Sequence, residues 1–260
     1  MCSLAMGGIL QEEEDAYGRE ILAHFMGEYS YEVVERDDGY FYCSGGPYSY
    51  FLEYEEWPEH QKAGLEYASG RVLDVGCGAG RVGLHLQDLG FSVLSIDNSP
   101  LSIEVCRMRG LRKVKLMPFD SIGPQLGTFQ TIVLYGNNFG LFESADRARE
   151  LLGRFHDISS PGATILAESN DYTDTDEEEH LAYRQWNQER GRMPGQFRLR
   201  VRFRKYVTPW FDYLTVTPEE MQEIVEPAGW HLDRIIQEED NNMYVGVLKR
   251  KEGVENYSSK

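Results

Sequence analysis

The chain has 260 residues, with 43 acidic and 26 basic side chains that give a formal net charge of −17. Hydrophobic residues make up 41% of the chain and charged residues 27%, which is typical of a globular protein and excludes wholesale disorder. No apolar run approaches the ~20 residues that a membrane-spanning helix needs. Because nucleic acids and anionic membranes repel so acidic a protein, we expect neither as a partner.

The start of the chain and the cysteines bear on the cellular compartment. Met1–Leu10 contains no Lys or Arg and is followed by acidic residues from Glu12 onward, so it does not resemble a secretory signal. The six histidines form no HxH or HExxH motif, so no metal site is predicted. The four cysteines form no CxxC motif, which predicts free thiols in a reducing cytoplasm (Cys2, Cys43, Cys77 and Cys106).

Residues 1–65 are acidic and rich in tyrosine, and we expect them to form a lid. Residues 12–29 can form an amphipathic helix, and the turn at residues 37–39 predicts a hairpin between residues 31–36 and 40–42. Pro58 can open a helix that runs to about Ala68. The tyrosines either wall a pocket for an aromatic or cationic substrate or simply pack under the lid (Tyr40, Tyr42, Tyr48, Tyr50 and Tyr54).

Residues 66–170 alternate between predicted strands and helices. Buried strands are predicted at residues 71–75, 91–96, 114–117, 130–135 and 163–167. Helices are predicted at residues 81–89, 101–109 and 145–158, the second of them capped by Ser99 and Pro100. This alternation predicts an α/β protein with a parallel sheet covered by helices on both faces.

The remaining residues are expected to complete this core around an insertion. Residues 171–215 predict a helix to about Arg190 and a β-hairpin, in which residues 197–204 alternate strictly between apolar residues and arginines. Thr217 to Glu220 form a capping box that opens a helix to about Ala228. Strands at residues 232–236 and 243–248 are expected to pair antiparallel, and residues 251–260 to form a frayed tail.

A glycine loop follows the first core strand, in the stretch Val72-Leu-Asp-Val-Gly-Cys-Gly-Ala-Gly-Arg81. Gly76, Gly78 and Gly80 form GxGxG, which differs from the GxGxxG of dinucleotide-binding proteins, and Asp74 precedes the first glycine by two residues. We expect the loop to let a ligand approach the backbone, with free N–H groups pointing toward the ligand at a helix N-terminus.

Polar side chains also follow the next three strands, where ligands of open α/β sheets bind. Asp97 can accept both hydroxyls of a ribose, and Asp120 can accept the exocyclic amine of a purine ring that Phe119 flanks. Tyr135-Gly136-Asn137-Asn138 follows the fourth strand. These positions together predict one ligand site at the carboxyl ends of consecutive parallel strands.

The stretch "LDVGCGAGR", followed by Asp97 and Asp120 after the next two strands, resembles the first motif and the ribose and adenine contacts of the class I S-adenosylmethionine-dependent methyltransferases. The resemblance covers about residues 65–250 and implies a doubly wound seven-stranded sheet, ordered 3-2-1-4-5-7-6 with strand 7 antiparallel. It implies S-adenosylmethionine as cofactor and S-adenosylhomocysteine as product. It also implies a cofactor site formed by Asp74, Gly76, Cys77, Gly78, Asp97, Asn98, Phe119, Asp120, Ser121 and Tyr135.

Two features depart from the family pattern. Gln130 stands early in the fourth strand, where members often carry an acid, and we expect that position to be structural. The fourth strand ends in "GNNFG", without the Asn/Asp-Pro-Pro-aromatic signature of enzymes that methylate base or glutamine amide nitrogens. This absence agrees with the charge argument against nucleic acid.

Several of these residues also have a purely structural interpretation. Asp74 can bind N–H groups of its own loop, Asp97 can cap the next helix, and Asp120 can be an ordinary loop acid. Cys77 is expected to be a small filler that meets the ligand through its backbone. Asn137 and Asn138 can be turn formers, because Asn tolerates turn conformations.

The domain organisation expected from these patterns has five parts. Residues 1–65 form an N-terminal lid, residues 66–170 the cofactor-binding core, residues 171–215 an insertion over the substrate site, residues 216–250 the completion of the core, and residues 251–260 a tail. The acidic charge and the two lids predict a methyltransferase for a small molecule, which the free thiols place in the cytoplasm. An acidic, aromatic-lined pocket would suit an amine, so nitrogen is slightly preferred over oxygen as acceptor atom. We expect a monomer or a homodimer.

The implied reaction is an in-line displacement, which needs alignment and exclusion of water more than a dedicated base. Tyr135, Asn137 and Asn138 are the candidates for positioning the acceptor. The arginines at 198, 200, 202 and 204 could bind an anion, or they could form a solvated face paired with acids such as Glu177 to Glu179.

Three other functions remain open. A methyltransferase of RNA or protein needs a basic patch, which only this row of arginines could supply. A regulatory protein could bind the cofactor without catalysis. A nicotinamide-dependent oxidoreductase is disfavoured by the GxGxG spacing.

Overall fold

The computed structural model describes residues 8–239 and 241–252. The chain divides into two compact units, each assembled from three segments. The first unit consists of the chain up to Trp57, Leu73–Ser121 and Phe197–Asp212. The second unit consists of Pro58–Val72, Ile122–Gln196 and the chain from Tyr213 onward.

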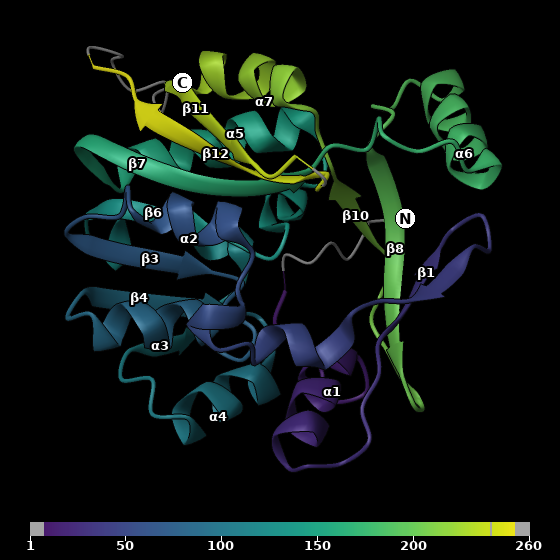
Figure 1. The fold of residues 1–260 in the computed structure, drawn as a ribbon, viewed down its shortest axis with the longest axis horizontal. Coiled ribbons are helices and arrows are strands. Elements are labelled where there is room, and N and C mark those ends of the chain that lie inside the picture. Colours follow the sequence, from purple (N-terminus) through teal and green to yellow (C-terminus); the bar gives the residue numbers. More distant parts are fainter. Residues whose placement is uncertain (1–7, 240, 253–260) are drawn as a thin grey trace. The chain divides into compact units, whose positions relative to one another are not determined.

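The main sheet has seven strands, and their hydrogen-bonded order confirms the order expected from the sequence (Figure 1). In that order the strands are β11 (Trp230–Gln237), β12 (Met243–Arg250), β7 (Ser159–Asn170), β6 (Phe129–Leu134), β3 (Arg71–Val75), β4 (Ser92–Asp97) and β5 (Val114–Leu116). β4 and β5 pair parallel, as do β6 and β7. The predicted antiparallel strand is also confirmed, since β12 runs antiparallel to both β7 and β11.

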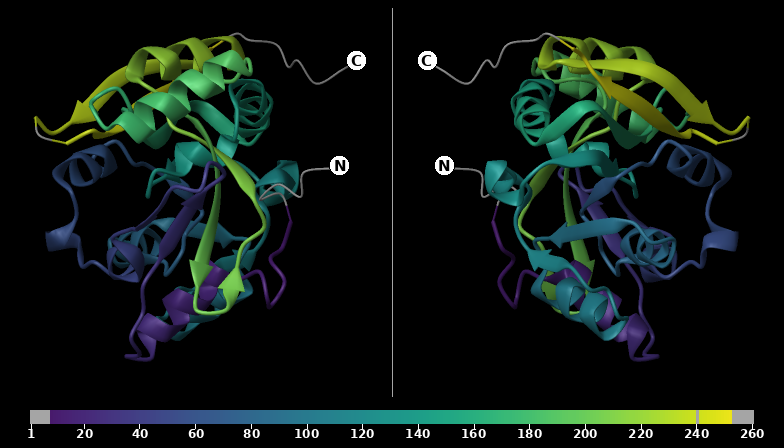
Figure 2. Two further views of the ribbon diagram at one scale, coloured as in Figure 1. Left: turned by 90° about the vertical axis from the view of Figure 1, so that its right-hand side faces the viewer. Right: turned by 90° about the vertical axis from the view of Figure 1, so that its left-hand side faces the viewer.

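In the first unit, α1 (Ala16–Phe25) packs against α4 (Pro100–Met108), as Figure 2 shows, and α3 (Arg81–Asp88) follows β3. Ser99 caps α4 as predicted, because its hydroxyl accepts the N–H of Ser102. Asp15 caps α1 by accepting the N–H of Gly18, and it also accepts the Ser99 hydroxyl and the Leu101 N–H. One buried carboxylate therefore joins the starts of two helices.

A second sheet has the order β10 (Phe211–Leu214), β8 (Gln196–Phe203), β1 (Val33–Arg36) and β2 (Phe41–Cys43), with β9 (Tyr206–Val207) pairing with β8. Both predicted hairpins are present, but they share this sheet, because β1 pairs antiparallel with β8 in the register Val34 to Val201. Figure 1 shows the long β8 ribbon beside β1. Strands of the N-terminal segment and of the insertion therefore share one sheet.

The second unit contains α2 (Glu59–Leu65), α5 (Ala145–Asp157), α6 (Glu178–Glu189) and α7 (Pro218–Val225). The predicted capping box opens α7, with Thr217 and Glu220 each bonding the backbone N–H of the other. α5 packs against α7, and α2 packs against β12. Six short 3-10 turns complete the chain at Gly46–Tyr50, Tyr54–Glu56, Phe119–Ser121, Pro124–Leu126, Asn138–Phe142 and Glu226–Ala228.

Two elements differ most from the bounds expected from the sequence. The first helix is shorter than residues 12–29, because it begins only after the Asp15 cap. β7 extends beyond residues 163–167 in both directions, since it is paired on both sides and a register shift against β6 accommodates Pro161 and Gly162. Most of the expected tail lies outside the described residues.

Among residues 8–239 and 241–252, no helix combines the length and the apolar character that crossing a membrane requires.

Replacing Asp15 with Ala should destabilise the protein by about 2–3 kcal/mol, because both helix starts lose an acceptor and buried donors stay unsatisfied. Denaturant unfolding measures this effect, and Glu13→Ala, which removes an exposed carboxylate, is the matched control. Equal unfolding midpoints for the two variants would show that Asp15 does not link the helices.

Candidate active site

The glycine loop between β3 and α3 requires its glycines. Gly76, Gly78 and Gly80 have φ angles of 68°, 53° and 81°, in the left-handed region that side chains disfavour. A Cβ atom on Gly78 would lie 3.1 Å from Cδ1 of Tyr50. Both the backbone conformation and the close approach of Tyr50 therefore exclude a side chain at Gly78.

The backbone N–H groups of this loop are used within the protein. Gly76 and Cys77 donate to the carbonyl of Ile96 at 2.9 and 3.0 Å, and Gly78 donates to Oδ2 of Asp97 at 2.9 Å. The expectation of free N–H groups pointing toward a ligand is therefore wrong for these three residues. Their hydrogen bonds hold the loop against the end of β4, so that the loop presents a preformed surface.

Asp97 ends β4 and accepts backbone hydrogen bonds from Gly78 and Ser99, each at 2.9 Å, and from Asn98. Burial, together with the charge of Asp15, raises the pKa of Asp97 to about 6 despite these bonds. The carboxylate is only partly buried, and an ionised carboxylate has about four acceptor positions. Capping α4 and accepting further hydroxyl groups are therefore compatible roles for Asp97.

The structure favours a structural role for the side chains of Asp74 and Cys77. Asp74 is buried, accepts the Ser95 hydroxyl at 2.8 Å, and has its pKa raised to about 6 by burial. The Cys77 sulfur lies 3.8 Å from that of Cys106 in an apolar cluster. Both cysteines, with Cys43, are free thiols, as predicted.

The segment after β5 lies at the end of β4, because Met117 N–H donates to the carbonyl of Asp97 at 2.8 Å. Phe119 is buried there, Asp120 is partly buried and Ser121 is exposed. The Asn98 side chain donates to the carbonyl of Gly8 at 3.1 Å. The first unit thus brings together all the predicted cofactor residues except Tyr135, and their role as cofactor contacts stays a prediction.

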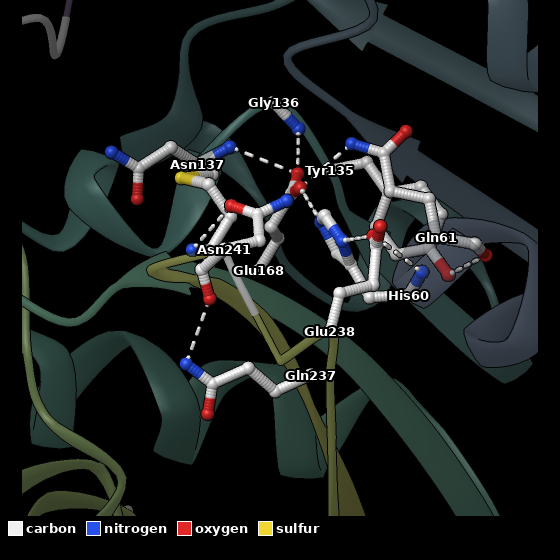
Figure 3. A network of polar contacts seen from close by, with 10 residues as sticks. His60, Gln61, Tyr135, Gly136, Asn137, Glu168, Gln237, Glu238 and Asn241 are labelled. Atoms are coloured by element: carbon white, nitrogen blue, oxygen red, sulfur yellow. Dashed lines mark hydrogen bonds and ion pairs between the residues drawn. The ribbon is translucent and has the colours of Figure 1, made fainter. Parts of the chain in front are cut away.

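The predicted acceptor-positioning residues follow β6 in the second unit (Figure 3). The Tyr135 hydroxyl donates to the carbonyl of Gln61 at 2.8 Å, which favours a structural role for that hydroxyl. Asn137 has a φ of 61°, so it is a turn former as expected. Its Oδ1 atom is nevertheless buried and has no hydrogen-bond partner among the described residues, which makes it available to a donor on a ligand.

The backbone after β6 is held by Glu168, a residue that the sequence analysis did not single out. Glu168 is buried on β7 and accepts the N–H groups of Gly136 and of Asn137. The Gln61 side chain donates to the same carboxylate at 2.7 Å, and His60 Nε2 lies 2.8 Å from it. Glu168 directly follows the apolar strand predicted at residues 163–167, and this was the one sequence signal that could have indicated its role.

His60 lies between two carboxylates, since its Nδ1 atom is 2.7 Å from Glu238. Burial lowers the pKa of His60, but the bonds to Glu168 and Glu238 outweigh burial and raise it above its usual value. Burial raises the pKa of Glu168, but the bonds from His60 and Gln61 outweigh burial and lower it. The network in Figure 3 is therefore a buried ion pair that positions the backbone of Asn137.

The row of arginines on β8 is paired with acids, but not with Glu177 to Glu179 as the sequence suggested. Glu35 on β1 accepts hydrogen bonds from Arg200 and Arg202, which lower its pKa to about 2. The other two pairs are Arg198 with Asp212 and Arg204 with Glu28. Glu35 and Asp212 lie on the two strands next to β8 in the sheet, and Glu28 precedes β1, so sequence proximity was the wrong guide. The predicted structural position Gln130 also has a partner, because its side chain accepts the N–H of Arg71.

Residues 72–162 match a protein family described as a methyltransferase domain. This match supports the resemblance to class I S-adenosylmethionine-dependent methyltransferases that the glycine-loop motif indicates. A carboxy-S-adenosyl-L-methionine synthase of Yersinia enterocolitica is 31% identical to the chain over 119 residues, which are 42% of this chain and 44% of that protein. A ubiquinone biosynthesis O-methyltransferase of Xanthomonas oryzae is 32% identical over 80 residues, 28% of this chain and 34% of that protein.

The chain spans less than half the length of these curated relatives. Among solved structures, a methyltransferase from Bacteroides fragilis in complex with S-adenosylhomocysteine has a TM-score of 0.80 at 23% identity, covering 95% of this chain and all of that one. The CcbJ methyltransferase of Streptomyces caelestis has a TM-score of 0.57 at 16% identity, covering 76% of this chain and 94% of that one. These structures share the fold around the methyltransferase domain.

The His60–Glu168 pair predicts a pH-dependent contribution to stability. Because the pKa of His60 is raised, its contribution is present below the unfolded value of about 6.5 and is lost as the pH rises through the folded pKa. Because the pKa of Glu168 is lowered, its contribution is present above its unfolded value and is lost as the pH falls through the folded pKa. The pair is therefore most stabilising between about pH 5 and pH 6.5.

We expect His60→Gln to cost about 3 kcal/mol of unfolding free energy in that window and less at higher pH. Denaturant unfolding across pH measures this difference. His231→Gln is the control, because it removes an exposed histidine that pairs with Glu226, and it should cost less than about 1 kcal/mol. A pH-independent loss in His60→Gln would contradict the assignment.

Proposed function

We propose that the protein is an S-adenosylmethionine-dependent methyltransferase that acts on a small-molecule acceptor, with nitrogen slightly favoured over oxygen. When bound, S-adenosylmethionine supplies an electrophilic methyl group, and in-line transfer of this group leaves S-adenosylhomocysteine. The methyltransferase domain and the chemistry of the predicted contact residues support this proposal. A cytoplasmic location and a monomeric or homodimeric state remain expectations.

The residues of the first unit fit the nucleoside part of this cofactor. The glycine loop leaves no room for a side chain at Gly78, so the backbone itself meets a ligand. Asp97 is only partly buried, and its carboxylate can accept a ribose hydroxyl in addition to the backbone bonds from Gly78, Asn98 and Ser99. Asp120 and Phe119 lie in the turn that Met117 ties to Asp97, which suits the adenine ring.

The pairing of the arginines is the observation that carries the choice of a small molecule. A nucleic-acid substrate needs cations that are free to contact phosphates, and this row was the only candidate in the sequence. Arg200 and Arg202 share Glu35, and the other two arginines have acids of their own. With these four arginines paired and a net charge of −17, the chain is poorly suited to RNA.

The protein contributes positioning rather than covalent chemistry to such a transfer. The unpartnered Oδ1 atom of Asn137 can accept an N–H or O–H of the acceptor, and Glu168 holds the Asn137 backbone in place. Asn138 begins the 3-10 turn that follows, and its positioning role remains a prediction. Oxygen is the second candidate acceptor atom, because the Xanthomonas relatives are named as O-methyltransferases.

Calorimetric titration with S-adenosylhomocysteine tests the cofactor site. Asp97→Ala should weaken binding at least about tenfold, because the ribose hydroxyls lose a charged acceptor. Asp88→Ala, which removes an exposed carboxylate on α3, should bind like the wild type. No binding by the wild-type protein would refute the proposed function.

A panel of small amines and phenols, assayed beside transfer RNA and protein substrates, tests the acceptor class. We expect methyl transfer to amines, weaker transfer to phenols and none to the macromolecules. Transfer to RNA or protein alone would refute the small-molecule assignment. Cofactor binding without transfer to any acceptor would favour a regulatory protein instead.

A further inference from the structure

Two acidic side chains face each other inside the first unit. Glu20 lies on α1 with none of its surface exposed, and Glu32, just before β1, is 6% exposed. Glu32 accepts the hydroxyl of Tyr50 at 3.1 Å and that of Ser44. The group that faces Glu20 is the Glu32 carboxyl, which is itself an acceptor.

Glu20 differs from Glu32 in that neither of its oxygens meets a donor among residues 8–239 and 241–252. Burial, and after it the Glu32 carboxyl, raises the pKa of Glu20 to about 12. Buried carboxylates are stable only when paired or hydrogen-bonded. With a pKa of about 12, Glu20 carries a proton at neutral pH and shares it with Glu32, and a cation that donates hydrogen bonds can take the place of that proton.

The neighbouring arginines are engaged elsewhere. Arg19 binds Glu12 at 2.6 Å and lies over the ring of Tyr206, and Arg36 binds Asp38 at 2.7 Å. An ammonium group has three N–H donors, which could bind the carboxyl oxygens of Glu20 and Glu32. The Tyr50 ring adds an aromatic surface beside Glu32, of the kind that cations favour.

Tyr50 links this pair to the glycine loop. Its hydroxyl donates to Glu32, while its ring edge lies where a Cβ on Gly78 would stand, 3.1 Å away. One tyrosine side chain therefore separates the two acids from the loop that is predicted to hold the cofactor. A ligand bound at Glu20 and Glu32 would be next to that loop.

We propose that Glu20 and Glu32 form a binding site for the ammonium group of a small ligand, supplied either by an amine acceptor or by the amino acid part of the cofactor. This inference rests on the proposed function and identifies a charge-recognition element for it. Because Glu20 has no exposed surface, ligand binding requires a local opening of the segments around it.

The test compares calorimetric binding to the wild type, Glu20→Gln and Glu32→Gln, with Glu13→Gln as an exposed carboxylate control. Phenethylamine and its neutral analogue 2-phenylethanol, each with saturating S-adenosylhomocysteine, probe the acceptor source. S-adenosylhomocysteine and 5′-methylthioadenosine, which lacks the amino acid part, probe the cofactor source. Denaturant unfolding of each variant verifies that it is folded.

If the acceptor supplies the ammonium group, the wild type prefers phenethylamine over 2-phenylethanol about 10- to 100-fold, and both Gln variants lose that preference. If the cofactor supplies it, the variants lose a similar factor for S-adenosylhomocysteine and none for 5′-methylthioadenosine. Either result supports the site. Folded variants that bind all four ligands like the wild type would overturn it and leave a proton-sharing structural pair.

The two proposals can fail separately. A wild-type protein that does not bind S-adenosylhomocysteine refutes the methyltransferase function. A wild-type protein that binds it, with no dependence of any ligand on Glu20 or Glu32, refutes only the ammonium site.

Discussion

The first unit depends on hydrogen bonds that tie the glycine loop to the end of β4. Ile96 and Asp97 together accept three consecutive N–H groups of the loop, from Gly76 to Gly78. These bonds fix the left-handed conformations of Gly76 and Gly78, which glycine adopts without strain. Asp97 also binds the first N–H of the next segment, so the loop, β4 and α4 form one rigid surface. This rigidity is what a cofactor site requires, since a preorganised surface loses little entropy on binding.

Both units contain buried carboxylates that accept hydrogen bonds from segments that are distant in sequence. Asp15 accepts three hydrogen bonds from two helix starts, and Glu168 accepts two backbone N–H groups in addition to side chains. Each satisfied carboxylate therefore orders a piece of backbone. Glu20 is equally buried and collects no donor from the described residues. Its difference from the other buried acids is the reason to look for a ligand there rather than for a structural role.

Sequence patterns predicted the sheet because they are local. The alternation of strands and helices predicted a parallel sheet, and the strand order was implied by the family resemblance that the glycine-loop motif carries. The pairing of Val34 with Val201 was not predictable, since either hairpin could have paired with many other strands. His60 and Glu168 are 108 residues apart, so no spacing rule connects them. The partners of the arginines were misassigned for the same reason, because proximity in sequence replaced proximity in the sheet.

Under the proposed function, the unpartnered atoms are a reason to prefer nitrogen over oxygen as the methyl acceptor. Asn137 Oδ1 in the second unit and both Glu20 oxygens in the first are acceptors without donors among the described residues. A phenol offers a single O–H, and it offers none once it is ionised for attack. A protonated amine offers up to three N–H donors, and a neutral amine still has N–H groups while its lone pair attacks. Acceptors that lack donors are thus matched by a ligand rich in N–H groups, and the acidic composition of the chain attracts such a ligand before it binds.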